Sequence, residues 1–441
     1  MHPLSHSPMT TSIAEQLVDL AMQARSDAAE VYAAQSLSRP VSFEANRLKQ
    51  LESTQTDGLA LRLWKDRRPG LVVAYGPVNP QALVDRALAL SALKEPEDID
   101  LTQSHQQVYP TEGQAIAVEA LVEMGQQTID QVRQAYPEVL CAGSWDCEVE
   151  TTRLINSQGL DLTFEDTTLN GFLEAALIRG EDFLTVYDGQ TCRGTLNSDT
   201  IAQEVLKRLD WAQESSEAPT GKVPVLFTAK AADLLWGTVQ SALNGKQVLE
   251  GASPWGDRLS QLILSPLITL WQDPTAGPFS CPFDDEGVTT QPLKFVEAGV
   301  LQSFYYDRMT GKSLGTSSTG NGFRHGLGSY PIPDLYNFLV QPGEASFEAI
   351  VRQIEDGIIV DQALGGGAGI SGELSINVDL GYRIQNGQIV GRVKDTMLAG
   401  NVYSALKQII ALGRDAEWNG SCWTPSISLE GLSVTGKTCT S

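Results

Sequence analysis

At 441 residues, the chain is too long for one ordinary hydrophobic core, so two or three domains are expected. A content of 42% hydrophobic and 19% charged residues is typical of a soluble globular protein. The net charge of −23 argues against direct nucleic-acid binding, which depends on Lys and Arg neutralising phosphates; its simplest interpretation is solubility.

The first predicted domain covers residues 12–95 and combines a helix, a sheet and a second helix. Ser12 and Glu15 have the spacing of a capping box and predict the start of the first helix. Alternating apolar residues predict strands at 28–35, 41–45, 59–63 and 71–75. Pro69-Gly70 predicts a hairpin between the last two strands, and Asn79-Pro80 begins a helix that runs to about Leu93.

The second predicted domain covers residues 112–215, after a polar linker over 94–112. Apolar periodicity predicts helices at 115–135 and 200–209. Between them, repeated alternation over 139–187 predicts antiparallel strands, with a turn at 156–159. A second polar linker is expected over residues 211–222.

The third predicted domain covers residues 222–440 and is rich in β-strands. Asn386-Gly387 predicts a hairpin between strands 375–384 and 388–393. One late helix is expected over 402–412, from Asn401 to Gly413. The fold class is therefore α+β: a helix–sheet–helix region and a middle antiparallel sheet, followed by a β-rich C-terminal domain.

The cysteines and the apolar stretches indicate the cellular compartment. Six cysteines are scattered without a C-x-x-C pair, which predicts reduced thiols in a cytoplasm. The first twelve residues do not form a secretory signal, and the apolar stretch around 259–271 is too short and too interrupted to span a bilayer. We therefore expect a cytoplasmic protein without membrane contact.

The most informative segment is the predicted helix that contains Leu234-Leu235-Trp236-Gly237-Thr238-Val239-Gln240-Ser241. It follows a strand-like run over 223–227 and precedes Asn244-Gly245. Further along lie three short segments: Asp284-Asp285-Glu286-Gly287-Val288-Thr289-Thr290-Gln291, Glu297-Ala298-Gly299-Val300-Leu301 and Thr319-Gly320-Asn321-Gly322-Phe323-Arg324.

This ordered set resembles the TldD/PmbA family, also called the modulator of DNA gyrase family. The resemblance extends over nearly the whole chain, including the N-terminal helix–sheet–helix unit. In the catalytic branch of the family the helix reads Leu-Leu-His-Glu-x-x-x-His and binds zinc. Trp236 stands at the first His, Gly237 at the Glu and Ser241 at the second His, so the chain is similar to the non-metal branch, called TldE or PmbA.

The residues themselves also argue against zinc catalysis by this chain. A catalytic zinc needs about three protein ligands and an open position for water. None of the four histidines, His2, His6, His105 and His325, lies on the helix expected at 229–243. Tryptophan cannot bind zinc and glycine offers no general base. We therefore predict no catalytic residue, no metal and no cofactor in this chain.

One cysteine has two interpretations. The resemblance implies that the third zinc ligand of catalytic members is a cysteine near the C-terminus, in about the region of Cys422. Without ligands on the helix, Cys422 is more simply interpreted as a small buried hydrophobic residue.

The block Asp284-Asp285-Glu286 and the nearby Arg324 are candidate substrate- or partner-binding residues. Three adjacent carboxylates suit a hard cation, although their spacing is not that of an EF-hand; the alternative is a turn whose carboxylates accept backbone N–H groups. The resemblance places this block beside the family's central cavity. Arg324 and His325 suit contact with a carboxylate or a partner, and the alternative for them is a surface salt bridge.

Two further patterns carry little functional weight. Residues 367–372 match G-x-G-x-x-G by letter, but an alternating strand pattern follows instead of the helix that a nucleotide site requires. The interpretations are a flexible turn, a close backbone approach or, by the resemblance, part of a peptide channel. No residue pattern indicates a Ser-His-Asp site, although such sites assemble across a fold.

The resemblance implies a non-catalytic subunit of a TldD/TldE-type zinc metalloprotease complex that acts on unfolded or precursor peptides. In this hypothesis a TldD-like partner supplies the zinc and the base, and the present chain is inactive alone. The alternatives are a stand-alone homodimeric peptide-binding or scaffold protein, and a hydrolase with an unrecognised site. The sequence does not decide between a homo- and a hetero-oligomer.

Overall fold

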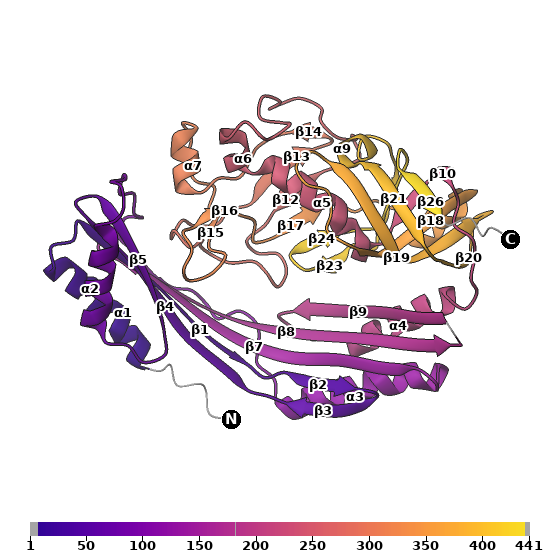
Figure 1. The fold of residues 1–441 in the computed structure, drawn as a ribbon, viewed down its shortest axis with the longest axis horizontal. Coiled ribbons are helices and arrows are strands. Elements are labelled where there is room, and N and C mark those ends of the chain that lie inside the picture. Colours follow the sequence, from indigo (N-terminus) through magenta and orange to yellow (C-terminus); the bar gives the residue numbers. More distant parts are fainter. Residues whose placement is uncertain (1–7, 181, 437–441) are drawn as a thin grey trace.

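The computed structural model describes residues 8–180 and 182–436, with the backbone alone for residues 8–12. A long curved sheet from the N-terminal half lies along a β-rich C-terminal half (Figure 1). This arrangement confirms the predicted α+β class with its β-rich C-terminal region.

The first sheet has the strand order β3-β2-β7-β1-β4-β5, and β8 joins it by pairing with β7, β6 and β9. Its strands are β1 (Ala28–Ser38), β2 (Val41–Glu44), β3 (Arg47–Leu51), β4 (Thr54–Lys65), β5 (Arg68–Tyr75), β6 (His105–Val108), β7 (Leu140–Asn156), β8 (Leu160–Arg179) and β9 (Asp182–Cys192). The predicted hairpin between β4 and β5 and the predicted antiparallel strands over 139–187 are confirmed.

Two strands of this sheet lie outside the predicted ones. β3 pairs with β2 at one edge. β6 lies within the segment expected to be a polar linker, where it pairs in parallel with β8, so that expectation is wrong for residues 105–108. β1 also pairs with β7, so the predicted domains 12–95 and 112–215 contribute strands to one continuous sheet.

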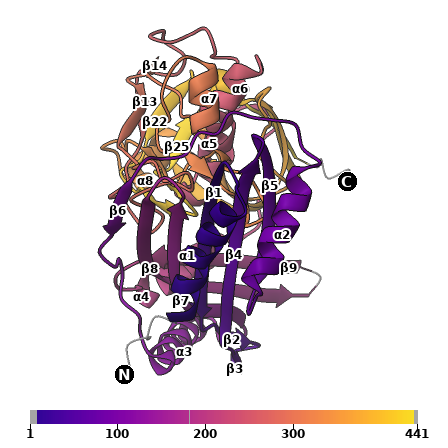
Figure 2. The same ribbon diagram turned by 90° about the vertical axis from the view of Figure 1, so that its left-hand side faces the viewer.

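Four helices accompany this sheet: α1 (Pro8–Gln23), α2 (Pro80–Ser91), α3 (Val118–Ala135) and α4 (Ser198–Trp211). α1 and α2 lie side by side on one face of the sheet (Figure 2). The predicted cap at Asn79 is confirmed, since its side chain accepts a hydrogen bond from the Ala82 N–H at 3.1 Å. The predicted start at Ser12 is wrong, because α1 already begins at Pro8.

The C-terminal half contains two larger sheets and one short pair. The larger sheet has the order β10-β26-β21-β19-β18-β11-β25-β22 with β20 beside β19; the other has the order β14-β13-β12-β17-β24-β23. The strands are β10 (Gly221–Lys222), β11 (Val225–Phe227), β12 (Leu270–Gln272), β13 (Leu293–Glu297), β14 (Val300–Leu301), β15 (Gly322–Phe323), β16 (Ile332–Pro333), β17 (Phe338–Val340), β18 (Asp356–Leu364), β19 (Glu373–Gln385), β20 (Gln388–Val393), β21 (Thr396–Asn401), β22 (Ile409–Leu412), β23 (Glu417–Asn419), β24 (Cys422–Thr424), β25 (Ile427–Leu429) and β26 (Ser433–Gly436).

The helices of this half are α5 (Ala229–Leu243), α6 (Gly245–Leu249), α7 (Arg308–Ser313), α8 (Phe347–Gln353) and α9 (Val402–Ala405). The predicted β19–β20 hairpin is confirmed, with Gln385 opposite Gln388. Buried side chains of α5 and of both large sheets form one hydrophobic core. No helix in the described part of the chain is long and apolar enough to cross a membrane.

The helix predicted over residues 402–412 is wrong beyond its first turn. Asn401 does cap a helix, since its side chain accepts the Ser404 N–H at 3.2 Å. That helix ends at Ala405, however, and β22 follows at Ile409 to pair with β25. The β-branched residues Ile409 and Ile410 suit a strand, and pairing with a distant strand overrides the helical spacing.

We predict that two glycines inside helices respond oppositely to alanine. A Cβ at Gly125 in α3 would lie 2.3 Å from a ring carbon of Phe43 and 2.8 Å from one of Trp145, whereas a Cβ at Gly237 in α5 would meet nothing within 4 Å. Gly237→Ala should raise the free energy of unfolding by about 0.5–1 kcal/mol through helix propensity. Gly125→Ala should lower it, because overpacking costs about 1–3 kcal/mol.

Both variants can be measured by denaturant unfolding beside the parent chain. Gly237→Ala is the matched control, since it changes helix propensity without changing packing. Equal shifts of the same sign would contradict the close packing of α3 on Phe43 and Trp145.

Candidate functional site

Helix α5 is positioned by a buried strand that precedes it and by the apolar face that it packs into the core. β11 precedes it in the centre of the large sheet, with every residue buried and paired with β18 and β25. The helix then buries an apolar face that includes Leu235, Trp236 and Val239. Asn244 ends it and caps α6 by accepting the Lys246 N–H at 2.8 Å. The strand, helix and Asn-Gly break predicted for this segment are confirmed.

Trp236 is a core residue. Its side chain has no exposed surface, and its ring lies 6.2 Å from that of Phe338. The indole N–H donates to Thr424 Oγ1 at 2.7 Å, so the one polar atom of the side chain is satisfied. The indole therefore fills interior space at the position where the resemblance places the first zinc-binding histidine.

The other two motif positions offer no metal ligand either. Gly237 is exposed on α5 and has no side chain. Ser241 Oγ donates to the Gly237 carbonyl at 3.0 Å, one turn back along the same helix. At about 100° per residue, positions 236 and 241 also point about 140° apart.

Cys422 lies next to this helix and is buried. Burial raises the pKa of its thiol well above the ordinary value, and the charge of Asp233 on α5 raises it further. Within residues 8–180 and 182–436, no three His, Cys, Asp or Glu side chains gather in a way that could hold a metal. The residues present therefore do not fit the zinc of the family's catalytic branch.

The hairpin β23–β24 connects α5 to a cavity. Asn419 Nδ2 donates to the Lys230 carbonyl at 2.6 Å, which ties the hairpin to the first turn of α5. Cys422 and Thr424 alternate with Trp423 along β24 and are buried, with Thr424 against Trp236. Trp418 and Trp423 are cross-strand partners, and both line the cavity.

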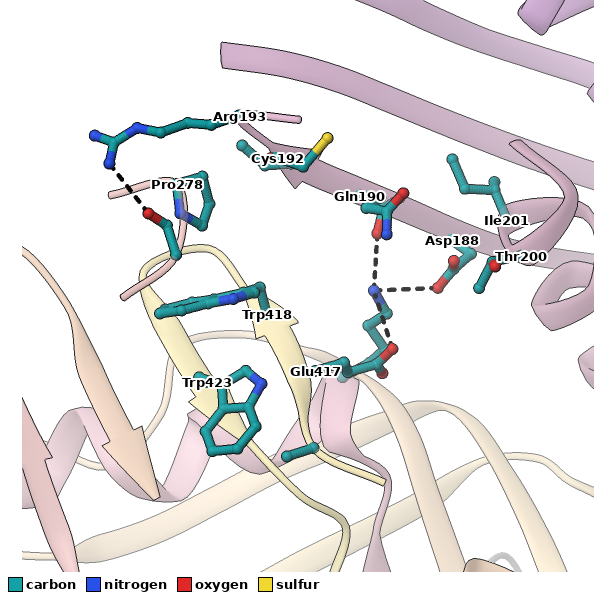
Figure 3. A pocket seen from close by; sticks show the side chains of 15 residues that line it. Asp188, Gln190, Cys192, Arg193, Thr200, Ile201, Pro278, Glu417, Trp418 and Trp423 are labelled. Atoms are coloured by element: carbon teal, nitrogen blue, oxygen red, sulfur yellow. Dashed lines mark hydrogen bonds and ion pairs between the residues drawn. The ribbon is translucent and has the colours of Figure 1, made fainter. Parts of the chain in front are cut away.

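The cavity encloses about 510 Å³ between β9, the start of α4, the loop at Gly277 and the hairpin (Figure 3). Lys230 Nζ lies 3.2 Å from Asp188 and 3.8 Å from Glu417, and it donates to the Gly189 carbonyl at 2.8 Å. Burial raises the pKa of Asp188, and it raises that of Glu417 to about 7, although Lys230 opposes both shifts.

None of the residues of this cavity was predicted from the sequence. One local signal was available: Gly420-Ser421 is a two-residue loop between the runs that carry Trp418 and Trp423, which is a typical hairpin pattern. Lys230 and Asp188 had no such signal, because they meet only when α5 packs near β9.

The block Asp284-Asp285-Glu286 forms a turn, as one of the two interpretations predicts. The Asp284 carboxylate accepts the N–H groups of Glu286, Val288 and Gly322 at 3.0, 2.9 and 2.8 Å. Asp285 accepts the Arg324 N–H at 2.7 Å, and Glu286 accepts the Arg308 N–H at 2.8 Å. All three carboxylates thus accept hydrogen bonds from backbone N–H groups of their own turn or of neighbouring segments.

Burial raises the pKa values of these three carboxyl groups, to about 7 for Asp284, about 6 for Asp285 and about 8 for Glu286. Hydrogen bonds from backbone N–H groups oppose the shift in each case. The block lies against the N-terminal half, since Thr102 Oγ1 donates to the Glu286 carbonyl at 2.6 Å.

Arg324 does not form the surface salt bridge that one interpretation predicted. Its side chain is 3% exposed and pairs at 3.0 Å with Glu30 of β1, which is 2% exposed. Glu30 also pairs with Arg62 of β4 at 3.0 Å, and the Arg324 guanidinium lies over the Tyr32 ring at 5.1 Å. Arg324 is therefore a buried link between the C-terminal half and the first sheet, and it lies close to the carboxylate block through Asp285.

In sequence, the histidines and the other cysteines lie outside helix α5 and the carboxylate block. His325 is exposed and lies 3.9 Å from Asp334, His105 lies in β6, and His2 and His6 fall outside the described residues. The described cysteines, Cys141, Cys147, Cys192, Cys281 and Cys422, are all free, and Cys439 falls outside the described residues.

The glycine-rich segment 367–372 approaches α5 closely and leads into β19, not into a helix. A Cβ at Gly367 would lie 2.8 Å from the Leu234 carbonyl, and Thr238 Oγ1 donates to the Ala368 carbonyl at 2.8 Å. The close-approach interpretation of this segment is confirmed.

Two family sequence models match the chain. The PmbA/TldA metallopeptidase C-terminal domain matches residues 220–436, and PmbA/TldA metallopeptidase domain 1 matches residues 29–91. The chain belongs to the TldD/PmbA family. The C-terminal match contains α5, the carboxylate block and the hairpin, so the segments that suggested the family in the sequence lie within it.

Individual relatives agree with this assignment. The chain is 25% identical to the metalloprotease PmbA of Escherichia coli O157:H7, over 99% of both chains. It is 30% identical to a metalloprotease of Archaeoglobus fulgidus, over 51% of this chain and 53% of that protein. The crystal structure of TldE from Thermococcus kodakarensis has the same fold, with a TM-score of 0.89 and 23% identity over 96% of this chain and 100% of that one.

We predict that Glu286 makes the stability of the fold depend on pH. Its folded pKa of about 8 lies above the ordinary value, so the folded chain retains a proton that the unfolded chain has lost. The folded state then binds more protons, and the free energy of unfolding falls as pH rises from about 4 to about 8. The fall is at most about 1.4 kcal/mol per pH unit for one proton.

Glu286→Gln should flatten this dependence, which unfolding curves at several pH values would measure. Glu297→Gln, which changes an exposed carboxylate, is the control and should leave the slope unchanged. A parent and a Glu286→Gln variant with parallel curves over this window would contradict the buried, protonated carboxyl.

Proposed function

We propose that this chain is a non-catalytic subunit of a zinc metalloprotease complex that acts on unfolded or precursor peptides. The observation that carries the proposal is the helix α5, in which the three motif positions hold a buried indole, an exposed glycine and a serine bonded to its own backbone. Metal-assisted peptide hydrolysis needs ligands that hold the ion and a base that takes a proton from water. The described residues supply neither at α5, so a partner is required.

A TldD-like partner with Leu-Leu-His-Glu-x-x-x-His on the equivalent helix would supply both. In the proposed complex the present chain contributes surfaces that bind the partner and the peptide. Several large apolar side chains are exposed on α6, on α7 and on the segment between α6 and β12. They are Leu249, Leu259, Leu262, Leu267, Met309 and Leu314. A contiguous apolar patch commonly marks a protein interface, so this side of the molecule is one surface to test for the partner, beside the exposed apolar side chains of the first sheet.

We predict that the isolated chain does not cleave denatured casein or an unstructured peptide. A mixture with the zinc-bearing partner should cleave both, and a chelator should abolish the activity because the zinc is removed. Peptide release is the readout, and co-purification from the host shows whether the two chains associate.

The outcomes separate the hypotheses. Chelator-insensitive cleavage by the isolated chain, unchanged by Trp236→Ala, would show a hydrolase with another site. A stable homodimer that neither associates with a zinc-bearing protein nor supports cleavage would favour a stand-alone peptide-binding or scaffold protein.

We also predict that restoring the motif does not restore an efficient peptidase. The triple variant Trp236→His, Gly237→Glu and Ser241→His should bind zinc weakly and turn over little peptide. Its first substitution empties core volume beside Phe338 and removes the donor to Thr424, and loss of a buried Trp typically costs about 3–5 kcal/mol. We also expect the new histidines to lack the surrounding hydrogen bonds that orient metal ligands, and loss of such partners typically costs about 10–100-fold in affinity or activity.

Zinc affinity, melting temperature and peptide cleavage of the triple variant are compared with those of the parent. Gly237→Glu with Ser241→His, which leaves Trp236 in place, is the control for the loss of core packing. Robust zinc-dependent cleavage by the triple variant alone would mean that the chain retains a complete catalytic frame.

A further inference from the structure

The cavity beside the β23–β24 hairpin is lined by more carboxyl groups than cations free to neutralise them. Asp188 and Glu417 face it with two carboxylates, and Lys230 lies between them with one positive charge. Arg193 also lines it but is already paired with Asp166 by two contacts of 2.7 and 2.8 Å. The lining therefore has one negative charge in excess when both carboxylates are ionised.

Cations next to the cavity lining do not neutralise this excess negative charge. Arg208 is buried and binds Asp361 at 2.8 Å and Glu204 at 2.9 Å, whereas Asp188 lies 3.9 Å away. Lys207 pairs with Glu204 at 3.4 Å. The nearby cations thus have carboxylates of their own.

Glu417 has acceptor capacity to spare. Its carboxylate accepts no hydrogen bond from the described residues, and its nearest cation is Lys230 at 3.8 Å. Its side chain is 37% exposed, so it can be reached from the cavity. A carboxylate has about four acceptor positions and can bind a guanidinium through two parallel N–H groups.

Two indoles line the same cavity as this carboxylate. Trp418 and Trp423 are cross-strand partners on one face of the hairpin, whereas Glu417 precedes Trp418 and pairs with Thr424, so its side chain reaches the cavity from the neighbouring strand position. Figure 3 shows both rings and Glu417 on the hairpin side of the cavity, with Asp188 across from them. Tryptophan is the best aromatic partner for a cation, and a planar guanidinium stacks on it.

We propose that this cavity binds an arginine side chain of a peptide, with its guanidinium between Glu417 and the Trp418–Trp423 pair. An open volume of about 510 Å³ accommodates such a side chain together with adjoining backbone. The proposal deepens the proposed function, on which it rests, by naming a basic residue as a feature of the bound peptide. No covalent step is involved.

The test uses the full chain and a flexible Gly/Ser peptide with one central arginine. Calorimetry and tryptophan fluorescence should show saturable binding, at least about tenfold tighter than that of the same peptide with norleucine, because charged hydrogen bonds are lost. N-acetyl-arginine amide should bind more weakly than the arginine peptide. A tighter fit for the free amide would show a small-molecule site and overturn the peptide assignment.

Variants then locate the binding. Glu417→Gln should weaken the arginine peptide at least about tenfold and leave the norleucine peptide unchanged. Glu430→Gln removes an exposed carboxylate elsewhere in the same half and is the matched control. Trp423→Leu should weaken binding at least about twofold through loss of the cation–π contact. Melting temperatures confirm that each variant is folded.

Three further results would overturn the proposal: no saturable binding, equal affinity for the arginine and norleucine peptides, or a Glu417→Gln variant that binds like the parent. These results are independent of the metalloprotease hypothesis, because they are measured on the isolated chain. Failure of the cavity test with intact cleavage of arginine-free peptides by the two-chain complex would reject this inference alone. Arginine binding without a cleaving partner would reject the proposed function alone.

Discussion

The hydrogen bond between the Trp236 indole and Thr424 Oγ1 fixes the relation between helix α5 and the β23–β24 hairpin. Both groups are fully buried, so without Thr424 the indole N–H would be left unsatisfied in the core, at a cost of about 1–3 kcal/mol, whereas the Thr424 hydroxyl also donates to the Pro425 carbonyl at 3.2 Å. Because strand residues alternate between faces, the contact of Thr424 with α5 turns Trp423 toward the cavity. One packing contact thus determines that Thr424 faces the helix and that Trp418 and Trp423 line the cavity.

The two halves of the molecule meet through buried ion pairs in addition to apolar contact. Glu30 of β1 binds Arg324, and Asp361 of β18 binds Arg208 of α4, with both members of each pair almost fully buried. Burying such pairs costs desolvation energy, and removing one partner leaves an uncompensated charge. Their consequence is a defined orientation of the C-terminal half over the long sheet. Burial in the same region keeps the adjoining carboxylates of the 284–286 turn partly protonated near neutral pH.

Local sequence signals were enough to predict most of the fold. The wrong predictions concern residues whose structure depends on long-range contacts. Asn79 and Asn386-Gly387 act through neighbouring residues, so the helix cap and the hairpin followed from the sequence. Ile409 instead pairs with Leu429, and this long-range pairing makes its segment a strand and not a helix. Arg324 is buried because Glu30 lies beside it, although the two are 294 residues apart in the chain. The burial of such a side chain cannot be predicted from the residues next to it in the sequence.

The candidate site also contains features that local sequence shows and features that only tertiary packing creates. The substitutions at 236, 237 and 241 are visible as letters on one helix, whereas Lys230, Asp188 and Glu417 become a group only through tertiary packing. The hairpin presents Thr424 to the helix and Trp418 and Trp423 to the cavity. Two other lining residues connect these faces, because Lys230 lies in the first turn of α5 and Glu417 is the cross-strand partner of Thr424. The helix that carries the motif positions and the cavity are therefore one packed unit, and a change in the volume of Trp236 reaches the cavity lining through Thr424 and its strand neighbour Trp423.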